Sequence, residues 1–224
     1  MLNKKIYISP SNQRGNLYAT GSTNEREQCH KIAAACVDYL KRAGFNVKCT
    51  YNDDMYQRVK ESNAFGADMH IAIHTNATAK HNVTGGTQIL LYSLDGERKR
   101  AGQRVFDELS AITPGKSAEK LIEKPDFYEC NSTKALAVYC ECEFHDTKEG
   151  SDFIIKNTKA MGEAIARGVC KYYGVALPKE KNSVPLKGET LFTVQSGAFG
   201  KRANAENHLK ALKKAGFDGF IVEK

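Results

Sequence analysis

The chain of 224 residues is predicted to form an α/β domain, a mostly parallel twisted sheet with helices on both faces, followed by a small βαβ unit. Short apolar runs alternate with longer segments whose apolar residues recur every three to four positions, as in successive βαβ crossovers. The hydrophobic content of 41% is enough for one substantial core but hardly for two full domains. A polar, proline-containing linker at 176–187 divides a first domain, residues 1–175, from a tail, residues 188–224.

The first part of the chain has the order β, α, β, α, β, which favours parallel strands joined by right-handed crossovers. A polar loop at 10–24 follows the first strand, and loops of this length are often functional. The first helix carries an apolar stripe that includes Ile32, Cys36 and Leu40, and Gly44 ends it. The expected elements are a strand at 5–9, a helix at 25–43, a strand at 46–50, a helix at 55–65 and a strand at 68–75.

The rest of the first domain continues with longer connections. Its expected elements are a strand at 86–92, a charged helix at 96–109, an extended surface excursion at 113–134, a strand at 135–144 and a closing helix at 150–173. The tail is expected to form a strand at 191–199, a helix at 203–215 and a strand at 217–222. So small a unit does not hold a stable core alone, so we expect it to pair, most simply with a second copy from another chain.

Composition narrows the class of protein. The net charge of +7 fits anionic polymers such as cell walls or nucleic acid and does not choose between them. The seven cysteines show no paired CxxC spacing, so reduced, mostly buried thiols are expected. No apolar run approaches the roughly 18 residues of a membrane span, and the first residues lack the pattern of a signal peptide.

The strand at 68–75 delivers a histidine to its carboxyl end. Met69, Ile71 and Ile73 alternate with His70 and His74, the period of two of an extended segment. Open α/β sheets bind ligands beyond the carboxyl ends of their strands, which makes His74 a candidate ligand or catalytic residue. The alternative is a histidine that only makes a hydrogen bond within a loop.

The strand at 135–144 carries two acids, Glu141 and Glu143, within an apolar run. A buried acid needs either solvent or a partner. A metal hydrolase needs fixed nitrogen and oxygen ligands and a carboxylate that takes a proton from water. The histidine at the end of one strand and the acid in the other are residues of these types. Glu25, at the start of the first helix, is a further candidate oxygen ligand; alternatively it is an acid that stabilises the helix dipole.

Three motifs occur in an order that resembles the zinc-dependent N-acetylmuramoyl-L-alanine amidases of bacteria and phages, over about residues 4–174. They are Glu25 ahead of Ile32-Ala33, then His74-Thr-Asn-Ala77, then Val138-Tyr-Cys-Glu-Cys-Glu-Phe144. The resemblance implies that His74 and Glu25 hold zinc and that Glu141 is the catalytic base. In the tail, Val194-Gln-Ser-Gly-Ala-Phe199 resembles half of a sporulation-related (SPOR) peptidoglycan-binding repeat.

One part of the amidase pattern fails, because Asn12 stands where the family has its first zinc-binding histidine. An amide oxygen is a poor zinc donor beside imidazole. Three explanations are open: Asn12 or Gln13 binds weakly, a histidine from elsewhere substitutes, or the site has a different metal or none.

The substitute histidines can be compared by position. His70 lies about 13 Å along the strand from His74, too far to share one ion, and His30 lies well around the first helix from Glu25. His81 and His145 remain open, with His145 the better candidate. We also take Asn76, Gln13 and His145 as candidate substrate-binding residues.

The resemblance implies a peptidoglycan hydrolase that cuts the amide between N-acetylmuramic acid and L-alanine of the stem peptide. The alternative is a catalytically inactive or metal-depleted peptidoglycan-binding protein on the same fold. We expect peptidoglycan rather than nucleic acid as the partner, and a homodimer through residues 188–224. We expect the chain to be cytoplasmic until it reaches the wall, as a phage lysin or by a non-classical secretion route.

Overall fold

The computed structural model describes residues 3–78, 85–178, 196–215 and 221. The chain divides into two compact units, Met1–Pro178 and Lys179–Lys224. Within the described part of the chain, no helix is long and apolar enough to cross a membrane.

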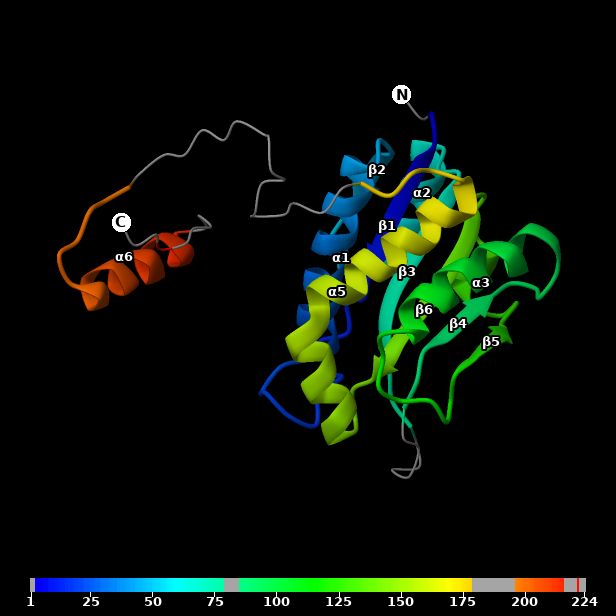
Figure 1. The fold of residues 1–224 in the computed structure, drawn as a ribbon. Coiled ribbons are helices and arrows are strands. Elements are labelled where there is room, and N and C mark those ends of the chain that lie inside the picture. Colours follow the sequence, from blue (N-terminus) through cyan, green and yellow to red (C-terminus); the bar gives the residue numbers. More distant parts are fainter. Residues whose placement is uncertain (1–2, 79–84, 179–195, 216–220, 222–224) are drawn as a thin grey trace. The chain divides into compact units, whose positions relative to one another are not determined.

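The first unit is built on one sheet of six strands in the order β2-β1-β3-β6-β4-β5 (Figure 1). β4 runs antiparallel to β6, and the other neighbouring strands are parallel. The predicted mostly parallel sheet is therefore confirmed. The strands are β1 (Lys5–Pro10), β2 (Asn46–Cys49), β3 (Met69–Asn76), β4 (Gln88–Leu91), β5 (Lys120–Glu123) and β6 (Leu136–Phe144).

Helices cover both faces of this sheet, as predicted. On one face α5 (Lys148–Tyr173) packs against α1 (Glu25–Arg42) and α3 (Gly96–Ser110). The other face carries α2 (Met55–Phe65) and the short α4 (Tyr128–Asn131). The helix α4 lies on the face of the sheet towards which the His74 side chain points, so its residues lie beside His74.

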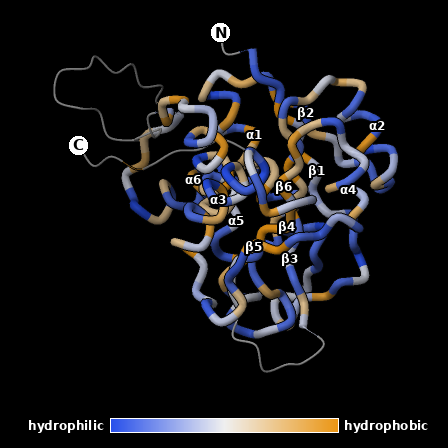
Figure 2. Tube along the Cα trace, turned by 90° about the vertical axis from the view of Figure 1, so that its right-hand side faces the viewer, coloured by the Kyte–Doolittle hydropathy of each residue, from blue (hydrophilic) through white to orange (hydrophobic). Residues whose placement is uncertain are grey.

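The alternation predicted for β3 divides its residues between these two faces. Met69, Ile71 and Ile73 are fully buried in the main core beneath α1, α3 and α5. Ala72 belongs to a second, smaller apolar cluster on the α4 side, together with Tyr139. Figure 2 shows hydrophobic residues concentrated in the central strands and hydrophilic residues around them. Burial on both faces explains why β3 has almost no polar residue before its carboxyl end.

The segment at 113–134 differs from the prediction of an extended surface excursion. It contains the edge strand β5 and the helix α4, and α4 returns to pack under β6. Each of these elements has only four residues. Elements so short do not show a readable periodicity, which is why the sequence pattern missed them.

In the second unit the structure describes one helix, α6 (Arg202–Lys214), close to the predicted span. None of its residues is buried. The predicted strands at 191–199 and 217–222 fall mostly outside the described residues, and residues 196–199 are not in a strand.

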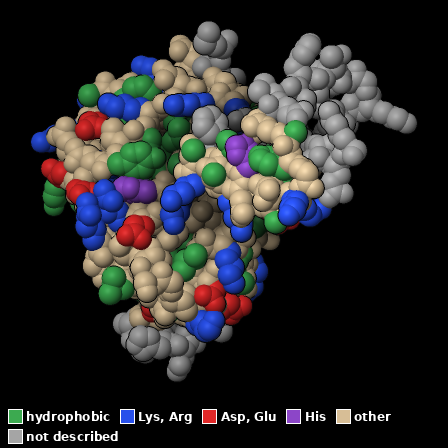
Figure 3. Space-filling model, turned by 90° about the vertical axis from the view of Figure 1, so that its left-hand side faces the viewer, with side chains coloured by type: hydrophobic (Ala, Val, Ile, Leu, Met, Phe, Trp, Pro, Cys, Tyr) green, Lys and Arg blue, Asp and Glu red, His purple; other side chains and the backbone are tan. Residues whose placement is uncertain are grey.

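All seven cysteines are free, and all but Cys49 are buried. Their burial agrees with the expectation of mostly buried thiols. The surface seen in Figure 3 shows Lys and Arg side chains interspersed with Asp and Glu rather than gathered into one basic patch. On that face the net positive charge is spread out.

Candidate functional site

The sheet brings Glu25, His74 and Glu141 to one place. His74 and Glu141 are direct neighbours across the parallel pair of β3 and β6, near the carboxyl ends of both strands. Glu25 is the first residue of α1, which follows the loop after β1. The carboxyl ends of parallel strands and the amino ends of the helices that follow them share one edge of such a sheet. The three residues selected from sequence motifs therefore form one cluster.

The loop between β1 and α1 is held against this cluster by hydrogen bonds. Asn24 caps α1, because its side chain accepts from the backbone N–H of Glu27. The backbone N–H of Glu25 donates to the carbonyl of Asn16 at 2.9 Å, and Asn16 Nδ2 donates to Glu25 Oε2 at 2.5 Å. The carboxylate of Glu25 is thus fixed from its own backbone and from the loop.

Glu25 and His74 form a buried pair in which Glu25 Oε1 lies 2.8 Å from His74 Nδ1. Their exposed fractions are 1% and 5%. The imidazole stacks on Tyr139 with ring centroids 4.4 Å apart, which fixes the plane of the ring. The two groups therefore present an oxygen and a nitrogen to one point with little freedom to move.

The charges around His74 favour its protonated form in the metal-free protein. Burial alone would lower the pKa of His74, but contacts with Glu129 and Glu25 and the charges of Glu25 and Glu141 raise it to about 9. Burial acts to raise the pKa of Glu25, but the hydrogen bond to His74, the charge of His74 and the hydrogen bonds from Asn16 and Ser11 together leave that pKa lowered. The site thus contains more negative than positive groups, and a cation suits it.

Glu141 is the acid in this cluster that is left without a partner. The side chain is partly exposed, but its Oε2 is buried and has no hydrogen-bond partner among the described residues. Burial raises the pKa of Glu141 to about 7; His74 opposes this shift and Glu25 adds to it. A carboxylate whose pKa lies near neutrality is suited to accept and return a proton at neutral pH.

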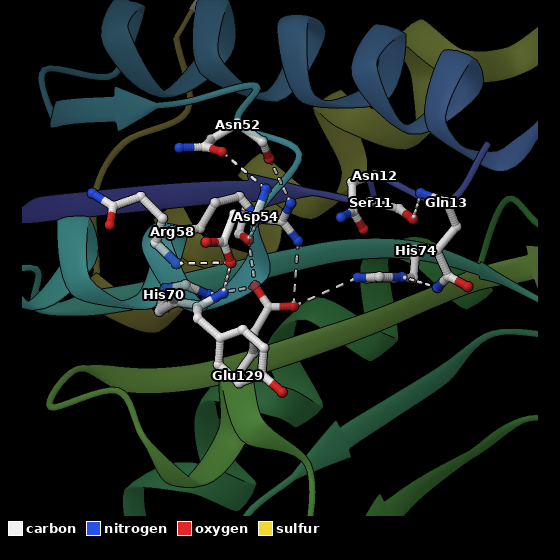
Figure 4. A network of polar contacts seen from close by, with 12 residues as sticks. Ser11, Asn12, Gln13, Asn52, Asp54, Arg58, His70, His74 and Glu129 are labelled. Carbon is white, nitrogen blue, oxygen red and sulfur yellow. Dashed lines mark hydrogen bonds and ion pairs between the residues drawn. The ribbon is translucent and has the colours of Figure 1, made fainter.

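Sequence reasoning missed a third acid of this cluster, Glu129, which α4 places beside His74. Its exposed fraction is 2%, and its Oε2 lies 3.7 Å from His74 Nε2 (Figure 4). Burial acts to raise the pKa of Glu129, but contacts with His70 and His74 outweigh it and lower that pKa. The sequence does contain a signal for this residue. Glu129 lies between Phe127-Tyr128 and Cys130, and a charged side chain among apolar residues is expected to have a partner.

The two amides next to the failed motif are placed differently. The Asn12 side chain donates to the backbone carbonyl of Asp53, whereas Gln13 Nε2 lies 3.5 Å from His74 Nδ1. Figure 4 shows Gln13 beside His74, so Gln13 is the amide next to the Glu25–His74 pair. Gln13 Oε1 accepts from Asn16 Nδ2 at 2.8 Å, so the amide nitrogen faces the pair, and the oxygen would face a metal ion only after the amide turns over.

A metal ion would find two strong donors here. The imidazole of His74 and the carboxylate of Glu25 converge, and both are ligand types that zinc accepts. Among the described residues there is no group of three or more His, Cys, Asp or Glu side chains that could hold a metal ion. The side chains thus fit the core of a zinc site, with an amide rather than a second histidine as the nearest further donor.

The other histidines that the structure describes in the first unit, His30, His70 and His145, contact residues other than Glu25 and His74. His145 is buried, stacked on Tyr18, and its Nδ1 lies 2.9 Å from Thr75 Oγ1. His70 is buried between Ser62 and Glu129, and His30 lies against Tyr51. His81 lies outside the described residues.

Two polar residues near the site hold the backbone. Glu143 is fully buried, and its carboxylate accepts from the backbone N–H groups of Gly86, Phe144 and Gly115 at 2.7 to 3.2 Å. It therefore has the partner that a buried acid needs. Asn76 donates to Gln88 Oε1 at 3.0 Å, which ties the end of β3 to β4.

Comparison with known proteins assigns the family. Residues 9–171 match the model of the N-acetylmuramoyl-L-alanine amidase family, and residues 172–223 match the SPOR domain. The chain belongs to this amidase family. The family is zinc-dependent, and the amidase is a peptidoglycan hydrolase that acts on the cell wall.

Relatives of the amidase support the same assignment. A sporulation-specific N-acetylmuramoyl-L-alanine amidase of Bacillus subtilis is 25% identical over 229 aligned positions, covering 98% of this chain and 85% of the relative. The amidase CwlM of Bacillus licheniformis is 22% identical, with 97% and 84% covered. The solved structure of AmiC2 of Nostoc punctiforme has a TM-score of 0.67 at 19% identity, covering 76% of this chain and 97% of that one, and shows that the fold is shared.

Proposed function

We propose that the amidase is a zinc enzyme in which His74 and Glu25 hold the ion and Glu141 is the general base. The observation that carries this proposal is the 2.8 Å contact between His74 Nδ1 and Glu25 Oε1 beside an acid with no hydrogen-bond partner among the described residues. The third position is filled by an amide, and the distance of 3.5 Å from His74 Nδ1 favours Gln13 over Asn12 for it. A carboxamide is a weaker zinc donor than imidazole, so we expect lower affinity than a site with two histidines would have.

Bound zinc supplies a Lewis acid that polarises the scissile carbonyl and lowers the pKa of a nearby water. The substrate is the amide between the lactyl group of N-acetylmuramic acid and L-alanine. Glu141 accepts the proton of the attacking water and returns it to the amide nitrogen as L-alanine leaves. Its pKa of about 7 suits both transfers. Tyr139 keeps the His74 ring in plane, and Asn16 keeps Glu25 in place.

Peptidoglycan is also the partner that we propose for the second unit. The match of residues 172–223 to the SPOR domain supports wall binding by this unit. We divide the chain into a catalytic domain at 1–175, a linker at 176–187 and a tail at 188–224 that binds wall and forms a homodimer. The absence of buried residues in α6 supports a partner for that helix. Asn76 and His145 stay predictions as substrate-binding residues, and so does the phage-type route of release.

Zinc affinity measured by chelator competition on the full chain tests the metal site. His74→Ala should lose most bound zinc, because it removes the strongest donor. Gln13→His should tighten binding, because it places an imidazole beside the Glu25–His74 pair, where the amide of Gln13 now lies. If zinc affinity is unchanged in both variants, any bound ion lies at another site. If the wild-type chain binds no zinc, the result favours an inactive wall-binding protein on the same fold.

A further inference from the structure

The carboxylate of Glu129 is held rigidly by one of its two oxygens. Oε1 accepts from Ser9 Oγ and lies 3.2 Å from His70 Nε2. Ser9 is in turn fixed by Arg58, whose Nε donates to Ser9 Oγ at 2.8 Å and whose Nη1 donates to the carbonyl of Asn52 at 2.8 Å. All of these side chains except Asn52 are buried, so the carboxylate has one orientation.

The second oxygen of Glu129 faces the functional pair. Oε2 lies 3.7 Å from His74 Nε2 and 3.9 Å from Arg58 Nη2. Oε2 and His74 Nε2 are both buried, and neither has a hydrogen-bond partner within the described residues. Two buried polar atoms that face each other and lack other partners point to an interaction between them.

We propose that Glu129 is a positioning residue that fixes the proton of His74 on Nε2. In the metal-free protein Nδ1 also carries a proton, which it donates to Glu25 at 2.8 Å. When zinc replaces that proton, the proton on Nε2 stays directed at Oε2 and the lone pair of Nδ1 would face the zinc position. A carboxylate behind a metal-binding histidine sets both its tautomer and its ring orientation. The zinc part of this inference rests on the proposed function, whereas the proton position does not.

A purely structural role predicts something different. Glu129 also lies near the buried guanidinium of Arg58, and neutralising that charge would be reason enough for an acid here. In that case loss of the carboxylate would lower stability without changing His74 itself. The state of the His74 ring therefore separates the two accounts.

The test replaces Glu129 by glutamine, which has nearly the same shape. An amide has only one oxygen, so Glu129→Gln either turns its NH2 towards His74 or loses the contacts with Ser9 and His70. The matched control is Glu108→Gln, which removes a carboxylate paired with Arg167 and Lys171 between α3 and α5. NMR of 15N-labelled histidine in the full chain reports the proton on His74 Nε2 in the metal-free and zinc-loaded states, and chelator competition reports zinc affinity.

We expect Glu129→Gln to shift or abolish the Nε2 proton signal and to weaken zinc binding by about 10- to 100-fold. Glu129→Asp should recover part of both effects, and Glu108→Gln should change neither. Should Glu129→Gln fail to fold with Arg58 unpaired, the double variant Arg58→Met/Glu129→Gln removes both charges and carries the same expectation. An unchanged Nε2 proton signal, or zinc binding as tight as in the wild type, overturns the inference. If the wild type binds no zinc, the proposed function fails, and the proton signal still decides the role of Glu129.

Discussion

Among the residues of the site, the acids have pKa values that are shifted in opposite directions. Glu25 and Glu129 contact His74 and have lowered pKa values, whereas Glu141 has no such contact and its pKa is raised to about 7. Environments that separate the pKa values of neighbouring acids separate their roles. This separation agrees with the proposed roles, in which Glu25 holds the ion, Glu129 positions His74 and Glu141 exchanges a proton.

The raised pKa of Glu141 predicts a dependence of stability on pH in the metal-free protein. The folded state keeps its proton up to about pH 7, whereas the unfolded state loses it near 4.5, so the folded state binds more protons in this window. The free energy of unfolding of the wild type, compared with that of Glu141→Gln, should therefore fall as the pH rises from 4.5 to about 7. Above about pH 7 the difference between the two proteins should stay constant. The shift corresponds to about 3 kcal/mol at most.

Urea unfolding of both metal-free proteins across this pH range measures the difference. Comparison with the variant cancels the titration of groups that do not interact with Glu141, whereas His74 and Glu25 interact with it and titrate together with it. A difference in the free energy of unfolding that does not change with pH would show that Glu141 titrates normally.

At the scale of elements, the site depends on how closely α1 and α5 approach. A Cβ on Gly162 would lie 2.2 Å from the carbonyl oxygen of Ile32 and 2.8 Å from Ala35 Cβ, and α1 begins with Glu25. Because backbone cannot yield like a flexible side chain, Gly162→Ala should destabilise the first unit by about 1–3 kcal/mol. Gly15→Ala is the control, since its Cβ would meet nothing within 4 Å.

Urea denaturation of the two variants decides this prediction. If Gly162→Ala has the same free energy of unfolding as the wild type, α1 and α5 accommodate the added methyl group without loss of stability.

The elements also show what the sequence could predict. β3 and β6 were predicted because both are apolar runs with an imidazole or a carboxylate near the end, and such residues stand out in a buried strand. Glu129 was not predicted, because α4 has four residues in a charged segment and its contact with β3 forms only in the folded sheet. The pairing of Gln13 rather than Asn12 with His74 depends on the path of a loop, which no periodic pattern encodes.

At the scale of the whole molecule, apolar side chains in the described part of the tail are left partly exposed. Leu209 and Leu212 of α6 are half-buried, Phe199 is 43% exposed, and α6 has no buried residue. Burying such side chains fully is worth about 1.5 to 3 kcal/mol each, and a symmetric pair of tails would bury them. We therefore predict that the full chain is a dimer. Truncation after Tyr173 should give a monomer that cleaves soluble muropeptide but binds intact wall less well.

Sedimentation of the full and truncated chains, with a wall pull-down of each, measures both parts of this prediction. A monomeric full chain would exclude the dimer and favour a tail without a partner copy. Equal wall binding by the truncated chain would remove the targeting role from the tail.

We propose that Glu25, His74 and Glu141 form the hydrolytic centre of the amidase. Mass spectrometry of purified wall fragments digested by the zinc-loaded wild type and by Glu141→Gln tests it most directly. The wild type should release stem peptides with a free L-alanine amino group. Glu141→Gln should fold and bind the same zinc, yet turn over about two to four orders of magnitude more slowly. Near-normal release of these peptides by Glu141→Gln would show that Glu141 is not the general base.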